Sequence, residues 1–244
     1  MMDLYIVTGA SRGLGLAFAR QLAADPAHCV LGISRAGVPA GVAAWRDLRV
    51  DLGTRSGLAA GAAGIVAAFA AQSWTRAVLI NNAGMIEPLG IRGRIDAARL
   101  QQNIAVNLIA PMVLMNAFLG ASMAVPARSV INISSGSGRR PMAGSGAYCA
   151  AKAGLDMASR VAALEEERTS NPARITSLAP GIIETDMQVA ARNAKEEEFP
   201  EVARFRAFKS EGLLKSADEV ARKIILLDRE GKLPAGIADV REIS

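Results

Sequence analysis

The chain has 244 residues, of which 51% are hydrophobic and 21% charged, so it can bury the core of one large α/β domain and does not have the composition of a disordered protein. Its net charge of +5 comes without a run of five or six basic residues, which argues against nucleic-acid binding and leaves a basic surface or a phosphate-rich ligand as explanations. Two separated cysteines and one histidine argue against a disulfide framework, a zinc site and a Ser-His-Asp hydrolase.

Signals for membrane insertion and export are weak in this sequence. No stretch of about 18 apolar residues runs without a charge or a break. We therefore expect no transmembrane helix and no membrane partner. The first residues, Met1-Met2-Asp3, lack the basic segment of a signal peptide. We therefore expect a cytoplasmic protein.

Predicted strands and helices alternate along the chain. Buried apolar runs and helical spacing predict, in chain order, a strand at 4–7, a helix at 13–24, strands at 29–33 and 48–50, a helix at 54–72, a strand at 77–80, a helix at 95–119, a strand at 129–133, a helix at 146–168, a strand at 174–178, a helix at 216–229 and a strand at 236–240. Pro111 should start a new helix or kink the stretch at 95–119.

This alternation is typical of an α/β fold. We expect one domain over residues 1–244, with a doubly wound parallel sheet, helices on both of its faces and a ligand beyond the carboxyl ends of the strands. Residues 186–210 are the least regular part of the chain. They are either a solvated helix face or a mobile lid over the substrate.

A glycine-rich turn, Thr8-Gly9-Ala10-Ser11-Arg12-Gly13-Leu14-Gly15, follows the first strand and opens the first helix. Gly9 allows the tight turn, Gly13 lets the backbone approach a pyrophosphate, and Gly15 lets helix and strand pack closely. The helix N-terminus supplies N–H donors and a partial positive charge for the phosphates. The turn therefore predicts a dinucleotide site.

The end of the second strand indicates which nicotinamide cofactor binds. An enzyme that uses NAD places an acid there for the ribose 2′-hydroxyl, but this chain has Ile33-Ser34-Arg35 and no acid between Val30 and Arg46. Arg35 is suited to pair with a 2′-phosphate, and Arg12 can reach the same phosphate from the other side. We predict NADPH/NADP+ as the cofactor, the alternative being that Arg35 is only a solvated loop residue.

Tyr148 and Lys152 lie four residues apart on a predicted helix and so share one face. A lysine cation one turn away favours the phenolate and lowers the pKa of a tyrosine, which makes the phenol a better acid–base catalyst near neutral pH. Ser135 follows the fifth strand, and its hydroxyl can hold the substrate oxygen that Tyr148 protonates. Taken alone, the Tyr148–Lys152 spacing is also compatible with an ordinary surface pair.

Together these motifs resemble those of the short-chain dehydrogenases/reductases over essentially the whole chain. The resemblance is carried by the glycine turn, Asn81-Asn82-Ala83-Gly84, Asn107, Ser135, Tyr148-x-x-x-Lys152 and Pro180-Gly181, in that order and spacing. It implies a seven-stranded Rossmann-type sheet and hydride transfer from a nicotinamide to a carbonyl carbon. It also implies a homodimer or homotetramer formed through the helices near 95–119 and 146–168.

The resemblance assigns a role to each matching residue. It implies Tyr148 as acid, Ser135 as holder of the substrate oxygen, Lys152 as ligand of the nicotinamide ribose, and Asn107 as holder of a water in the proton relay. Asp51 and Leu52 would flank the adenine, with Asn82 to Gly84 beside the adenine ribose. The implied cofactor-binding set is Gly9, Ser11, Arg12, Gly13, Leu14, Gly15, Arg35, Asp51, Leu52, Asn82, Ala83, Gly84, Tyr148, Lys152, Pro180, Gly181, Ile183, Thr185 and Met187.

A narrower resemblance is to the sepiapterin reductases and the related bacterial benzil reductases, carried by residues 147–153, 163–166, 179–188 and 236–242. In sepiapterin reductases a C-terminal aspartate anchors the pterin, and Asp239 is the nearest candidate here, although the match needs a one-residue gap. A diketone or another bulky aryl ketone is the alternative substrate, even though an aromatic content of 4% offers few rings to stack on it.

The expected function is therefore NADPH-dependent reduction of a small carbonyl compound, with Ser135, Tyr148 and Asp239 facing the substrate. Two alternatives remain. One is an alcohol dehydrogenase that runs in the oxidative direction, and the other is a catalytically silent NADP-binding sensor or scaffold. The intact set of Asn107, Ser135, Tyr148 and Lys152 argues against a scaffold, which needs none of them together.

Overall fold

Seven parallel strands form one sheet at the centre of the molecule, which we describe from a computed structural model covering residues 2–40 and 45–243. The strand order is β3-β2-β1-β4-β5-β6-β7, so the order reverses between β1 and β4, as in a doubly wound fold. The predicted seven-stranded Rossmann-type sheet is confirmed. The strands are β1 (Asp3–Thr8), β2 (His28–Ser34), β3 (Trp45–Arg49), β4 (Arg76–Asn81), β5 (Ala127–Ile133), β6 (Arg174–Ala179) and β7 (Gly236–Asp239).

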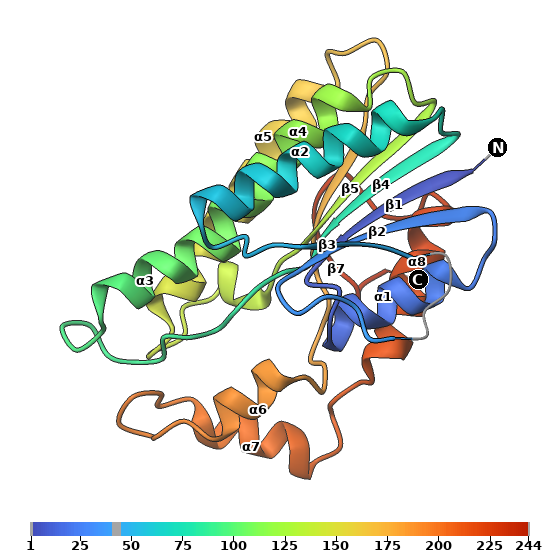
Figure 1. The fold of residues 1–244 in the computed structure, drawn as a ribbon. Coiled ribbons are helices and arrows are strands. Elements are labelled where there is room, and N and C mark those ends of the chain that lie inside the picture. The colour runs from blue at the N-terminus through green and yellow to red at the C-terminus, as the bar shows by residue number, and fades with distance from the viewer. Residues whose placement is uncertain (1, 41–44, 244) are drawn as a thin grey trace.

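Helices cover both faces of this sheet (Figure 1). On one face lie α2 (Arg55–Ala71), α4 (Ala110–Ala121) and α5 (Gly146–Glu166), and on the other lie α1 (Gly13–Ala23) and α8 (Ala217–Arg229). Successive strand residues point to opposite faces. In β1, Ile6 packs in the core under α2 and α4, whereas Val7 packs in the core under α1 and α8. Both faces are buried, which explains why the strands read as continuous apolar runs.

The predicted helix at 95–119 is one stretch made of three parts. An α-helix, α3 (Ala97–Ile104), passes through a π-helical turn at Ala105–Ile109 into α4, and Pro111 lies in the first turn of α4. The expected effect of Pro111 is confirmed. Proline has no N–H to donate to the carbonyl four residues earlier, which is that of Asn107, and π turns of this kind often occur at functional sites.

This stretch also bears on the expectation that the chain has no transmembrane helix. By length and composition alone, the helical stretch Ala97–Ala121 is apolar enough to cross a bilayer, with a mean hydropathy of 1.9. The sequence led us to expect no transmembrane helix, because no apolar stretch of that length lacks a charge or a break. In the fold, Leu114 and Phe118 of this stretch are fully buried against the sheet, and it also buries Asn103 and Asn107, as a core helix of an α/β domain does.

Residues 186–210 contain two helices that the sequence did not predict, α6 (Asp186–Arg192) and α7 (Val202–Ser210). They lie together beyond the end of the sheet (Figure 1). In the sequence they come between β6 and α8. The backbone closes the base of this excursion, because Lys215 donates to Ile182 and accepts from Glu184. We call the segment from 186 to 210 the helical flap.

Candidate functional site

A groove of about 1020 Å³ runs along the carboxyl ends of the strands, where the sheet order reverses. The sequence motifs meet there although they are spread over more than 200 residues. Of the predicted site residues, the groove is lined by Gly9, Ser11, Arg12, Gly13, Leu14, Arg35, Asp51, Leu52, Asn82, Ala83, Gly84, Ser135, Tyr148, Lys152, Pro180, Gly181, Ile183, Thr185, Met187 and Asp239. Gly15 and Asn107 lie behind its wall.

The glycines of the turn are required by close contacts. A Cβ atom at Gly15 would lie 2.2 Å from the carbonyl oxygen of Gly9, so this position holds α1 against the end of β1. Gly9 has a positive φ of 68°, and a Cβ there would lie 2.9 Å from the Cα of Ala83. Gly13 also has a positive φ, but a Cβ there would meet only the Thr185 side chain, at 3.5 Å. The turn thus packs on its inner side and leaves space toward the groove.

At the end of β2, Ser34 and Arg35 both line the groove. The Ser34 hydroxyl is buried and has no hydrogen-bond partner among the described residues. Arg12, on the opposite side, pairs with Asp186 at the start of α6, with 3.0 Å between Nη1 and Oδ2. Both side chains of that pair are about two-thirds exposed, so the pair contributes little stability and Arg12 can exchange its partner at little cost. Ser34 is a groove residue that was not among the predicted site residues.

Asn107 is fully buried and lies behind Gly84 and Met85. Its side chain accepts from the backbone N–H of Met85 at 3.2 Å and donates to the carbonyl of Met85 at 2.8 Å. A Cβ at Gly84 would lie 2.9 Å from Oδ1 of Asn107 and 3.8 Å from Nζ of Lys152. The side chain of Asn107 therefore supports the loop after β4, next to the Lys152 ammonium, and does not itself line the groove.

Ser135, Tyr148 and Lys152 converge at the middle of the groove. The Nζ of Lys152 lies 5.7 Å from the centre of the Tyr148 ring and donates a 2.8 Å hydrogen bond to the carbonyl of Ile133, at the end of β5. Ser135 caps the short 3₁₀ turn Gly136–Gly138 by accepting from the N–H of Ser137. A Cβ at Gly138 would lie 2.9 Å from the carbonyl carbon of Lys152, so this turn packs directly on the backbone of α5.

Burial dominates the ionisation of both catalytic candidates. Burial raises the pKa of Tyr148 to about 12, and the Ser135 hydroxyl beside the phenol acts in the opposite direction. Burial also lowers the pKa of Lys152 to about 8, partly opposed by the Asp156 carboxylate. The expected lowering of the Tyr148 pKa by Lys152 is therefore not found in the protein without ligand. At neutral pH Tyr148 is a phenol and can donate a proton.

Asp239, the candidate pterin anchor, lines the groove but already has a partner. Its carboxylate accepts from Nε and Nη2 of Arg241 at 2.9 and 2.6 Å, and from the N–H of the same residue at 3.0 Å. These hydrogen bonds hold the pKa of Asp239 below its usual range. A ligand that used Asp239 would therefore have to compete with Arg241.

The helical flap brings further side chains to the groove that the sequence did not point to. Phe205 and Phe208 of α7 line it, with 5.6 Å between their ring centres, and Arg204 lies 5.4 Å from the Phe208 ring. Met142, from the loop before α5, also lines the groove. Low aromatic content suggested few rings for stacking, yet two of the six phenylalanines lie here. No local sequence signal marks them, because their position depends on how α7 packs beyond the end of the sheet.

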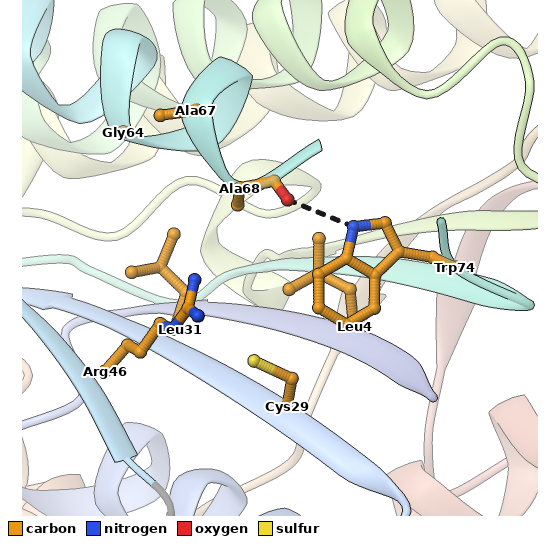
Figure 2. A pocket seen from close by; sticks show the side chains of 8 residues that line it. All are labelled: Leu4, Cys29, Leu31, Arg46, Gly64, Ala67, Ala68 and Trp74. Carbon is orange, nitrogen blue, oxygen red and sulfur yellow. Dashed lines mark hydrogen bonds between the residues drawn. The ribbon is translucent and has the colours of Figure 1, made fainter. Parts of the chain in front are cut away.

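A second cavity, of about 120 Å³, lies between α2 and the strands β1, β2 and β3 (Figure 2). It is mainly apolar, and the indole N–H of Trp74 at its edge donates to the carbonyl of Ala68 at 3.0 Å. Cys29 and Arg46 also line it, but it includes none of the predicted site residues. The predicted site residues therefore lie in or beside the large groove and not in this cavity.

Known proteins are similar to this chain over nearly its whole length. Residues 4–196 match the family model described as short chain dehydrogenase. The chain is 33% identical to the benzil reductase ((S)-benzoin forming) of Bacillus subtilis (strain 168) over 242 residues, which cover 99% of each protein. It is also 33% identical to the sepiapterin reductase of Rattus norvegicus over 249 residues, covering 92% of this chain and 91% of the relative.

Solved structures show the same fold at lower identity. The crystal structure of the KRED1-Pglu enzyme has a TM-score of 0.83 at 24% identity and covers 97% of this chain and 100% of its own. The ligand-free aldohexose dehydrogenase of Thermoplasma acidophilum has a TM-score of 0.77 at 22% identity, with coverages of 98% and 93%.

The raised pKa of Tyr148 can be tested by spectroscopic titration. The chain has two tyrosines, and burial also raises the pKa of Tyr5 to about 12, so Tyr5→Phe leaves Tyr148 as the single reporter. In this variant without ligand we expect the tyrosinate absorbance to stay absent until well above pH 10. The folded pKa exceeds the unfolded one, so the stability linked to Tyr148 is complete below about pH 10 and is lost as the pH rises toward 12. A half-titration near pH 10, with native circular dichroism, would contradict the burial effect.

Proposed function

The chain belongs to the short-chain dehydrogenase family, whose members are oxidoreductases that act on carbonyl and hydroxyl groups with a nicotinamide cofactor, and on this premise we propose that it is an NADPH-dependent carbonyl reductase. The proposal depends most on one observation. Ser135, from the turn after β5, lines one groove with Tyr148 and Lys152 of α5, beside the glycine turn and at the switch point of the sheet. That is the position in which a phenol can protonate an oxygen next to a bound nicotinamide.

The residues of the groove fit NADPH. Arg35 and the hydroxyl of Ser34, which has no partner among the described residues, offer donors at the end of β2, where no acid follows the strand, and Arg12 lies across the groove. Asp51 is near the adenine side, but its Oδ1 is engaged by the N–H of Gly53 at 2.8 Å. The open side of the glycine turn offers the N-terminus of α1 to the diphosphate. These features favour a cofactor that carries a 2′-phosphate.

The chain's own groups hold the substrate oxygen and supply its proton. When bound, the reduced nicotinamide supplies the hydride that is added to the carbonyl carbon. Ser135 donates a hydrogen bond to the substrate oxygen, and Tyr148 transfers its phenolic proton to that oxygen. The ammonium of Lys152 lies beside the ring, binds the ribose and stabilises the phenolate that remains. A phenol whose pKa is about 12 carries its proton at neutral pH and can donate it to the substrate oxygen, as reduction requires.

For the substrate we propose an aryl ketone or diketone like the one named for the benzil reductase of Bacillus subtilis. Phe205, Phe208 and Met142 offer an apolar and aromatic wall for such rings. A sepiapterin-like substrate is the second candidate, because the chain is similar to sepiapterin reductases and Asp239 lines the groove. Because the Asp239 carboxylate is engaged by Arg241, we expect a higher kcat/KM for benzil than for sepiapterin.

We also propose that the protein is a cytoplasmic homodimer or homotetramer. The helices predicted to pair carry exposed apolar side chains, and α5 contacts both α3 and α4. On the stretch from α3 to α4 and on α5 these side chains are Leu100, Ile109, Met112, Val113, Met157, Val161 and Leu164. A second copy would bury this face.

Replacing the proposed acid tests the reaction directly. Tyr148→Phe removes the proton donor while keeping the ring, so we expect kcat for NADPH-dependent reduction of benzil to fall at least about 100-fold. Affinity for NADPH, followed by the fluorescence of the bound cofactor, should change little. Tyr5→Phe is the matched control and should keep full activity. Turnover that survives in Tyr148→Phe would refute the proposed acid, and tight NADPH binding without turnover of any carbonyl by the wild type would favour a scaffold.

The cofactor preference can be tested at Arg35. Arg35→Asp replaces a donor for the 2′-phosphate with a charge that repels it, so kcat/KM for NADPH should fall about 10- to 100-fold while that for NADH falls less. Arg222→Asp, an exposed change of the same kind on α8 and outside the groove, is the control. An unchanged preference in Arg35→Asp, or equal use of NADH by the wild type, would show that Arg35 does not select the cofactor.

The aromatic wall can be tested at Phe208. Phe208→Ala removes a ring that we expect to pack on an aryl group, so KM for benzil should rise about 3- to 10-fold. A short aliphatic diketone serves as the control substrate, and its KM should stay within about twofold because it does not reach the wall. Equal effects on both substrates would argue that Phe208 only supports the fold of α7.

A further inference from the structure

Asp156 is a buried carboxylate that the proposed reaction does not use. It lies on α5 one turn after Lys152, is only 4% exposed and does not line the groove. Its Oδ1 accepts hydrogen bonds from the hydroxyls of Ser134 at 2.5 Å and Ser177 at 2.6 Å, and its Oδ2 accepts from Nε of Arg139 at 3.1 Å. Each of these donors comes from a different segment of the chain.

Through these contacts Asp156 connects the parts that carry the catalytic group. Ser134 directly precedes Ser135 at the end of β5, and Ser177 is on the neighbouring strand β6. Arg139 follows the 3₁₀ turn that Ser135 caps, and its Nη2 donates to the carbonyl of Ala238 in β7 at 3.0 Å. One carboxylate thus joins the helix of Tyr148 and Lys152 to the segment of Ser135.

The charge of Asp156 also acts on Lys152. The two residues are four apart and so lie on the same face of α5. The groups that face the Lys152 ammonium are the neutral phenol of Tyr148, the carbonyl of Ile133 and the Asp156 carboxylate, with the Arg139 cation beyond that carboxylate. Burial lowers the pKa of Lys152 to about 8, and Asp156 raises it. Loss of the carboxylate would leave Arg139 without this partner, and both changes disfavour the ammonium.

We propose that Asp156 is a positioning residue: without touching substrate or cofactor, it fixes the Ser135 segment against the helix of Tyr148 and Lys152 and places a negative charge one turn behind the Lys152 ammonium. This inference rests on the proposed function, because it assigns Asp156 a part in that reaction.

The molecule contains a matched carboxylate for comparison. Asp228 of α8 is also buried, and it accepts from the hydroxyl of Ser129 at 3.0 Å and from Nη2 of Arg76 at 2.6 Å. Ser129 lies near the start of β5 and Ser134 directly after its end, so the two carboxylates hold opposite ends of one strand by the same chemistry. Asp228 is at the amino edge of the sheet, away from the groove.

The test compares Asp156→Asn with Asp228→Asn in the protein with NADPH and benzil. Each substitution keeps the size of the side chain and an oxygen that accepts hydrogen bonds, and removes one charge. We expect Asp156→Asn to lower kcat about 10-fold, with KM for benzil within about twofold. Because loss of the carboxylate eases proton loss from the Tyr148–Lys152 pair, the alkaline limb of the kcat/KM profile should move about one unit to lower pH. Asp228→Asn should lose thermal stability but keep the wild-type profile and kcat.

An Asp156→Asn variant that keeps the wild-type kcat and pH profile would overturn the inference and leave Asp156 a purely structural residue.

Should that variant not fold, Ser134→Ala removes one donor and keeps the charge. It should lower kcat several-fold without moving the alkaline limb, whereas Ser129→Ala should not lower kcat; an unchanged kcat in Ser134→Ala overturns the positioning role. A wild type that reduces no carbonyl refutes the proposed function, whereas an active wild type with an unaffected Asp156→Asn refutes only the part of Asp156.

Discussion

Burial of Tyr148 and Lys152 together is the constraint on which the rest of the site depends. A low-dielectric environment disfavours the charged form of each group, so it raises the pKa of the phenol to about 12 and lowers that of the ammonium to about 8. The phenol consequently keeps its proton, as a donor must. The ammonium needs support, and the protein gives it a carbonyl, that of Ile133, and a carboxylate, that of Asp156.

The topology of the sheet brings these groups together at one edge. Parallel strands end together, and at the switch point between β1 and β4 the loops diverge and leave a groove. Gly15 brings α1 close to β1, and Gly138 brings the turn of Ser135 close to α5, so backbone approaches backbone on both sides of that groove. The pair Arg12–Asp186 joins the glycine turn to the start of the helical flap, so the flap lies beside this turn.

Much of this arrangement could be predicted from local sequence. Apolar runs of strand length and helical spacing located the strands within about two residues in most cases, because both faces of a parallel sheet are buried and little else produces that pattern. The turn from Thr8 to Gly15 and the spacing of Tyr148 and Lys152 were informative because each is confined to one short segment. The α6 and α7 helices were missed because their short apolar stretches pack on each other and on Tyr148 and Ile86, contacts distant in sequence.

The sequence by itself determined the alternation of strands and helices, the dinucleotide turn and the residue types of the catalytic group, because these depend on local spacing and on what each side chain can do. Only the tertiary structure decided the ionisation of Tyr148, the engagement of Asp239 by Arg241, the aromatic wall of α7 and the contacts of Asp156. Each of these depends on burial or on partners brought close by folding, and the cost of burying a charge is set by those surroundings rather than by neighbours along the chain.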